Sequence, residues 1–204
     1  MTVPYLSMDA LITLIDEPAR RGCRQLLADQ RVHFQAVPGS THNHQAWPGG
    51  YFDHIQEVLN IAVVLYGTFD RLRPLPFTLS DALLVLFLHD LEKPWAYESN
   101  TSGGLQRKAA LVTKEAQQAF RLEQLQRYDI RLTPEQQNAL RYAEGEIGQY
   151  SNQERVMGPL AAFCHGCDVT SARLWFDHPW AAHDPWVGAS RQRDESQQEG
   201  LEES

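Results

Sequence analysis

The feature that most constrains the fold of this chain is an unbroken run of seven apolar residues at positions 82–88, followed directly by His89 and Asp90. A membrane-spanning helix needs about 20 apolar residues, so this run predicts a helix buried in a protein core. Thr78 or Ser80 can cap its start, because a hydroxyl accepts a hydrogen bond from a free N–H of the first turn. The sequence therefore predicts a central helix with a histidine and an acid at its C-terminal end.

The rest of the chain is also dominated by helical spacing of apolar residues. Thr133, Pro134 and Gln136 have the residue types favoured at the cap, first and third positions of a helix. Glycine, proline and serine predict loops over residues 31–50 and 99–105. No alternating strand pattern competes, so we expect an all-α fold. The other predicted helices cover residues 8–29, 51–65, 108–128 and 154–176.

Charge and composition limit the classes of partner. The 204 residues include 18 Lys+Arg and 26 Asp+Glu, for a net charge of −8, which disfavours stable binding to nucleic acid but allows a small phosphorylated ligand. Residues 190–204 are rich in Glu, Gln and Ser and predict an acidic, disordered tail after a single domain at 1–189. The absence of a signal-like N-terminus and of a disulfide pattern among three cysteines predicts a cytoplasmic protein without a membrane partner. The sequence leaves open whether the protein forms a homo-oligomer.

Four residues predict a metal site. His54 lies near the start of one predicted helix, His89 and Asp90 end the apolar helix, and Asp168 lies inside the last long helix. Imidazole nitrogens and carboxylate oxygens that converge from rigid elements are the ligands of divalent transition metals. Their positions on three helices allow the four side chains to meet at one point. The alternative is that polar residues stand at these helix ends by chance.

Three segments carry a resemblance to a known family. HQAWPGGYFDH at 44–54 resembles the opening motif of HD-domain phosphohydrolases, LFLHDLEKP at 86–94 looks like their histidine–aspartate doublet, and FCHGCDVTSAR at 163–173 resembles their closing aspartate helix. The matches follow the order of the family. The resemblance implies an all-α, HD-domain-like bundle and metal-assisted hydrolysis of phosphate esters. The metal ligands that it implies are His54, His89, Asp90 and Asp168.

The chain also departs from the family pattern. Residues 92–164 contain no histidine, and Ala143 and Glu144 stand where a second-metal histidine pair would lie. Glu92 replaces the glycine that usually follows the doublet. We therefore expect one divalent transition metal, either Mn, Fe, Co, Ni or Zn, since mixed nitrogen and oxygen ligation suits all of them.

Three further residues are candidates for substrate binding. Lys93 and Arg173 offer positive charge to a phosphate, while the alternatives are a lysine beside a helix C-terminus and an arginine paired with an acid. Trp47 could line the pocket or support a loop.

Proton transfer has its own candidates. Asp90 is expected to be catalytic as well as metal-ligating, and Glu144 or His44 could move protons. The alternatives are an exposed helix carboxylate for Glu144 and a backbone-capping loop histidine for His44.

Other conspicuous residues have structural interpretations. We expect Cys164 and Cys167 to be buried thiols, because too few partners exist for a structural zinc. His165 is expected to be a packed core histidine, with a supporting role beside Asp168 as the alternative. The His/Pro/Trp-rich segment 177–186 is expected to be a strap whose tryptophans pack on the body, with stacking on a base or binding of a partner as the alternative.

Taken together, the sequence predicts a hydrolase that cleaves a phosphate ester or anhydride of a small substrate by means of a metal-activated water. A nucleotide or deoxynucleotide is the leading substrate class. The alternatives are a phosphodiesterase acting on oligonucleotides or cyclic nucleotides, and a non-catalytic binding module with the HD fold.

Overall fold

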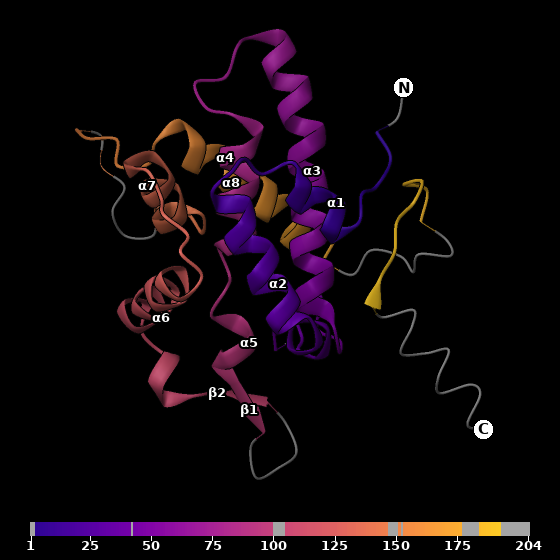
Figure 1. The fold of residues 1–204 in the computed structure, drawn as a ribbon, viewed down its shortest axis with the longest axis vertical. Coiled ribbons are helices and arrows are strands. Elements are labelled where there is room, and N and C mark those ends of the chain that lie inside the picture. The colour runs from indigo at the N-terminus through magenta and orange to yellow at the C-terminus, as the bar shows by residue number, and fades with distance from the viewer. Residues whose placement is uncertain are drawn as a thin grey trace.

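The structure is a computed structural model that describes residues 3–41, 43–99, 105–146, 151, 153–176 and 184–192. Over these ranges the fold is helical apart from one small hairpin, which confirms the all-α prediction (Figure 1). The helices are α1 (Met8–Thr13), α2 (Ala19–Ala36), α3 (Gly50–Leu72), α4 (Leu79–Leu88), α5 (Lys93–Ala96), α6 (Lys114–Arg127), α7 (Pro134–Tyr142) and α8 (Pro159–Val169).

Short elements join and extend these helices. Strand β1 (Tyr97–Ser99) pairs antiparallel with β2 (Leu105–Arg107) in a hairpin that the sequence analysis did not predict. A 3-10 turn (Ala109–Leu111) precedes α6, and a π-helical turn (Thr170–Leu174) continues α8. Most of the predicted loop at 99–105 lies outside the described residues.

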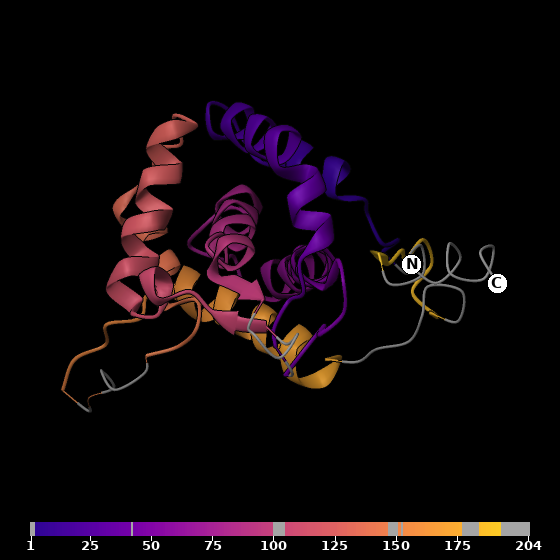
Figure 2. The same ribbon diagram turned by 90° about the horizontal axis from the view of Figure 1, so that it is seen from below.

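Helix α4 forms the centre of the core, as predicted. Every residue from 82 to 88 is buried, and the helix packs against α2, α3, α7 and α8. Figure 2 shows the other helices arranged around it. Thr78 caps its start: the hydroxyl accepts from the Asp81 N–H at 3.1 Å, and the Asp81 carboxylate accepts from the Thr78 N–H at 2.8 Å. The cap and the apolar run together place His89 and Asp90 inside the protein.

Helix α3 begins where a loop presses against its first turn. A Cβ atom on Gly50 would lie only 1.9 Å from the carbonyl oxygen of Gln45, so this position requires glycine. Gly49 has a φ of 79°, which a residue with a side chain rarely adopts. From residue 50 to 62 the helix is buried on all sides. It then continues to Leu72, beyond the predicted end at residue 65, with one side exposed to solvent.

Several predicted helix boundaries were wrong. The helix expected at 8–29 is divided into α1 and α2, because Pro18 has no N–H with which to continue α1. The segment 108–128 is also divided, with the Thr113 hydroxyl capping the start of α6. Helix α8 starts at Pro159, five residues later than predicted. By contrast, the Thr133 cap of α7 and its reciprocal bond with Gln136 are confirmed.

The C-terminal segment packs against α3 and the N-terminal residues. Arg191 is buried, and the Gln192 N–H donates to the Asp53 carboxylate at 2.7 Å. The first residues of the predicted tail, 190–192, thus make buried polar contacts, and residues 193–204 lie outside the described ranges. Trp186 packs edge-on against Tyr5 with ring centroids 5.2 Å apart, as expected for a strap. Residues 177–183 of that segment lie outside the described ranges.

No helix in the described part of the chain combines the length and apolar character needed to cross a membrane.

Candidate metal centre

Three helices bring the four predicted metal ligands to one point. His54 comes from α3, His89 and Asp90 follow α4, and Asp168 comes from α8. The Asp168 Oδ1 atom lies 3.1 Å from Nε2 of His54 and 3.6 Å from Nε2 of His89. The Asp90 Oδ2 atom lies 3.3 Å from Nε2 of His89 and 3.6 Å from Nε2 of His54. The predicted set is therefore brought together in space.

In both imidazoles, the Nδ1 atom makes a hydrogen bond on the side away from the carboxylates. His89 Nδ1 lies 2.7 Å from the carbonyl oxygen of Leu86, which can only accept, so Nδ1 carries the proton. The Ser171 hydroxyl donates to Glu57 at 2.7 Å and so accepts from His54 Nδ1 at 3.1 Å. In the neutral form each ring therefore directs the bare Nε2 atom at the carboxylates. Outer partners of this kind orient histidine ligands in metal sites.

The electrostatics of the site favour a positive charge between the two carboxylates. Burial alone lowers the pKa of His89, but Asp90 and Asp168 outweigh it and raise the pKa well above its ordinary value. Burial likewise acts to raise the pKa of Asp90, but Lys93 and then His89 outweigh it and hold that pKa well below its usual range. For His54, burial is the largest influence and lowers the pKa. A bound cation would replace the proton on His89, since metal ligands must be deprotonated.

The donor set fits a divalent transition metal. Nε2 of His54 and Nε2 of His89 are buried, and within the described residues they face only the carboxylates of Asp90 and Asp168. A buried polar atom without a partner is destabilising unless something else satisfies it. Two imidazole nitrogens facing two carboxylates offer the mixed ligation that such ions prefer.

A second group of acids lies next to the first. Oxygens of Asp90, Glu92 and Glu144 lie within 4.8 Å of one another and could also hold a cation. Each of these carboxylates, however, already has a basic side chain beside it. These ion pairs reduce the need for a further ion at this second group. Lys93 lies beside Asp90, Arg121 beside Glu92 and Lys114 beside Glu144.

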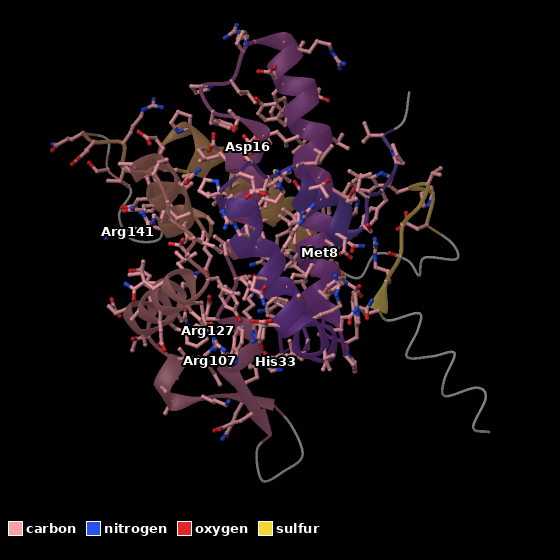
Figure 3. The ribbon with its side chains drawn as sticks, viewed as in Figure 1. Met8, Asp16, His33, Arg107, Arg127 and Arg141 are labelled. Carbon is pink, nitrogen blue, oxygen red and sulfur yellow. The ribbon has the colours of Figure 1, made fainter. Side chains whose placement is uncertain are left out.

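A cavity of about 340 Å³ opens beside these ligands, with Asp90 and Asp168 in its wall. Four basic side chains contribute to its lining. Sequence reasoning proposed two of them and missed Arg107, on the hairpin strand β2 (labelled in Figure 3), and Lys114, in the first turn of α6. Nothing local in the sequence marks these two, because only the packing of the hairpin and α6 brings them to the candidate metal ligands. The four residues are Lys93, Arg107, Lys114 and Arg173.

The remaining candidates are distributed differently. His44, Glu144 and His165 line the cavity, so the prediction of a packed core position for His165 was wrong. Trp47 is not among the described residues in the lining, which contradicts its proposed place in the pocket. Its indole donates instead to Asp53 at 2.8 Å, because the loop before α3 folds back on the first turn.

His44 is the better placed of the two candidates for proton transfer. Its ring centroid lies 4.7 Å from that of His54, and burial lowers its pKa to about 4, so the ring is neutral at pH 7. The Gln45 amide nitrogen donates to Ser171 at 3.2 Å, which leaves the amide oxygen to accept from His44 Nδ1 at 2.7 Å. His44 Nε2 is therefore unprotonated. Glu144, by contrast, is ion-paired with Lys114.

The cysteines take no part in the site. Cys164 and Cys167 are free, buried thiols, as predicted, and burial raises the pKa of both. Cys23 is a third buried thiol.

No protein-family model, curated protein or solved structure matches this chain.

Proposed function

We propose that this protein is a metal-dependent phosphohydrolase of the HD type that cleaves a phosphate ester or anhydride of a small substrate. One observation carries the proposal: two imidazole nitrogens and two carboxylates converge next to a cavity lined by four basic side chains. The resemblance of the three sequence motifs supports the same conclusion. Nucleotides and deoxynucleotides are the first substrate class to test.

His54, His89, Asp90 and Asp168 would hold one divalent ion. Such an ion, when bound, lowers the pKa of a coordinated water and polarises a phosphoryl oxygen. The chain supplies the rest of the chemistry. Lys93 lies 2.5 Å from Asp90 at the cavity wall, and Asp90 outweighs burial to raise the pKa of this lysine, which stays charged. The charge of Lys93 can stabilise the negative charge that develops on a phosphate group during hydrolysis.

The other basic residues are suited to binding and orientation. Arg107 and Arg173 are exposed at the cavity rim, where they can contact the outer part of a phosphorylated substrate. His44 is suited to proton transfer, because its unprotonated Nε2 can accept a proton from the attacking water. A general base of low pKa holds that proton only transiently, so transfer onward to the leaving group or to solvent follows.

The test is a metal and substrate screen on the purified protein. Metal-free protein is reconstituted separately with Mn²⁺, Fe²⁺, Co²⁺, Ni²⁺ and Zn²⁺, and phosphate release is measured with nucleoside mono-, di- and triphosphates. Cyclic nucleotides and short oligonucleotides test the phosphodiesterase alternative. We expect hydrolysis with at least one metal and its loss in the His89→Ala/Asp90→Ala double variant. Arg131→Ala, at an exposed position outside the cavity lining, is the matched control and is expected to retain activity.

Two outcomes would contradict the proposal. A double variant that hydrolyses the substrate at the wild-type rate would refute the metal site. A wild-type protein that binds no divalent ion, shows no thermal stabilisation by any of them and releases no phosphate would favour a binding module instead.

A further inference from the structure

A continuous chain of buried hydrogen bonds connects the C-terminal segment to the candidate metal ligand His54. Arg191 Nη2 donates to Glu57 Oε1 at 2.9 Å. Glu57 Oε2 accepts from the Ser171 hydroxyl at 2.7 Å, and Ser171 Oγ lies 3.1 Å from His54 Nδ1. These four residues are only 0–5% exposed. The residues come from three separate parts of the chain, and none of Arg191, Glu57 and Ser171 lines the cavity.

The direction of these hydrogen bonds decides which nitrogen of His54 is bare. Ser171 has a single hydroxyl proton and gives it to the carboxylate of Glu57. Its oxygen must therefore accept a proton from His54 Nδ1, which leaves Nε2 without one. Nε2 is the atom that faces Asp90 and Asp168. If the direction were reversed, Ser171 would donate to Nδ1 and the proton would move to Nε2, where it blocks metal ligation.

Arg191 favours that direction because its guanidinium, 2.9 Å from Glu57 Oε1, attracts the ionised form of this carboxyl. Burial raises the pKa of Glu57, Arg191 is the largest influence that lowers it, and the balance is a pKa of about 7. Without the guanidinium this pKa would be higher, and the protonated carboxyl would become a donor toward Ser171. Arg191 is itself held in place: the same Nη2 atom donates to Asp184 at 3.0 Å, and the guanidinium lies 5.1 Å from the Tyr5 ring centroid.

We propose that Arg191 is a positioning residue for the metal centre: through Glu57 and Ser171 it holds His54 in the tautomer whose Nε2 can bind a metal. This inference rests on the proposed function, because it requires the metal site. It assigns a role to a segment that contributes nothing to the cavity itself. Loss of an outer partner of a ligating histidine typically reduces metal affinity 10- to 100-fold.

The experiment compares the divalent-ion affinity of the full chain with that of three variants, using Mn²⁺ and Zn²⁺ in competition with a chromogenic chelator. Arg191→Ala and Glu57→Gln should each weaken binding by about 10- to 100-fold. Arg191→Lys retains a positive charge beside Glu57 and should restore part of the affinity. Arg31→Ala removes an arginine from an exposed ion pair with Asp9 and serves as the control with unchanged affinity.

A second readout separates positioning from general damage to the fold. In metal-free protein, the ¹⁵N chemical shifts of the His54 ring distinguish the two tautomers. Wild type should show the proton on Nδ1, and Arg191→Ala and Glu57→Gln should shift the population toward Nε2. If Arg191→Ala does not fold, Glu57→Gln decides, because it neutralises the carboxyl while Arg191 keeps its bond to Asp184.

The failures of the two proposals are distinguishable. A wild-type protein that binds Mn²⁺ or Zn²⁺, with variants that bind within twofold of it and show an unchanged His54 tautomer, overturns the role of Arg191 and leaves the proposed function intact. A wild-type protein that binds neither ion overturns both.

Discussion

The buried ion pair between Arg121 and Glu92 lies next to the candidate metal centre, and its contribution to the stability of the protein can be measured. Arg121 Nη1 lies 3.3 Å from Glu92 Oε2 and donates to the backbone carbonyl of His89 at 2.5 Å. The two side chains are 7% and 2% exposed. Arg131 and Asp129 form a pair with the same separation of 3.3 Å, but their side chains are 86% and 83% exposed. The two pairs therefore differ in burial and not in distance.

Arg121→Met should destabilise the protein by about 3–5 kcal/mol, because Glu92 would be left buried without its cation. In a chain of this length, each kcal/mol corresponds to about 2–4 °C in Tm, so the expected fall is about 6–20 °C. Adding Glu92→Gln to this variant should recover part of the loss, since the unpaired charge is removed. Arg131→Ala should give no resolvable change, because water already solvates both of its partners.

The assay is urea and thermal unfolding of metal-free protein followed by circular dichroism, with the double variant completing a thermodynamic cycle. An Arg121→Met variant as stable as Arg131→Ala would refute the reasoning. So would a double variant no more stable than Arg121→Met, since the cost would then not come from the unpaired carboxylate.

Gly50→Ala should destabilise the protein by more than about 1 kcal/mol, because the new Cβ would lie 1.9 Å from the Gln45 carbonyl oxygen. Gly67→Ala on the same helix meets no atom within 4 Å and should stabilise the protein by up to about 1 kcal/mol. Urea unfolding measures both changes. Burial raises the pKa of Cys23 to about 12, and none of the three buried thiols should react with an aromatic disulfide reagent at neutral pH before the protein unfolds. Burial also raises the pKa of Glu57 from 4.5 to about 7, so the folded state binds this proton more tightly than the unfolded state. Stability should therefore fall as the pH rises through that window, and Glu57→Gln should flatten this part of the unfolding profile.

These three predictions have clear contrary results. Equal effects of alanine at the two glycines would show that the loop before α3 does not press on Gly50. Rapid labelling of any thiol in the native protein would contradict its burial. A pH profile that is identical in wild type and Glu57→Gln would show that this carboxyl is not the group that titrates.

Local sequence was sufficient wherever a feature depends on neighbouring residues. The apolar run at 82–88 predicted the central helix, and the residue types around Thr133 predicted the start of α7. These succeed because caps and helical periodicity involve residues that are three or four positions apart. Where the pattern was interrupted, local reasoning failed: Pro18 divides the first helix, and the hairpin strands are too short to show alternation.

The candidate metal ligands were predictable for a different reason. His54, His89, Asp90 and Asp168 lie within motifs that resemble a known family, so their residue types and order were visible in the sequence. Their convergence to within 3.1–3.6 Å was not, because it depends on how α3, α4 and α8 pack.

An all-α fold and the chemical character of the candidate centre could thus be inferred from the sequence alone. The side chains that surround the centre could not, because they depend on how the helices pack. Arg107 and Lys114 reach the cavity, Trp47 does not, and Arg191 contacts Glu57 from 134 positions away. The physical reason is that helix formation is governed by contacts within one or two turns, whereas the charge, hydrogen bonding and solvent exposure around a buried site are set by side chains that only folding brings together.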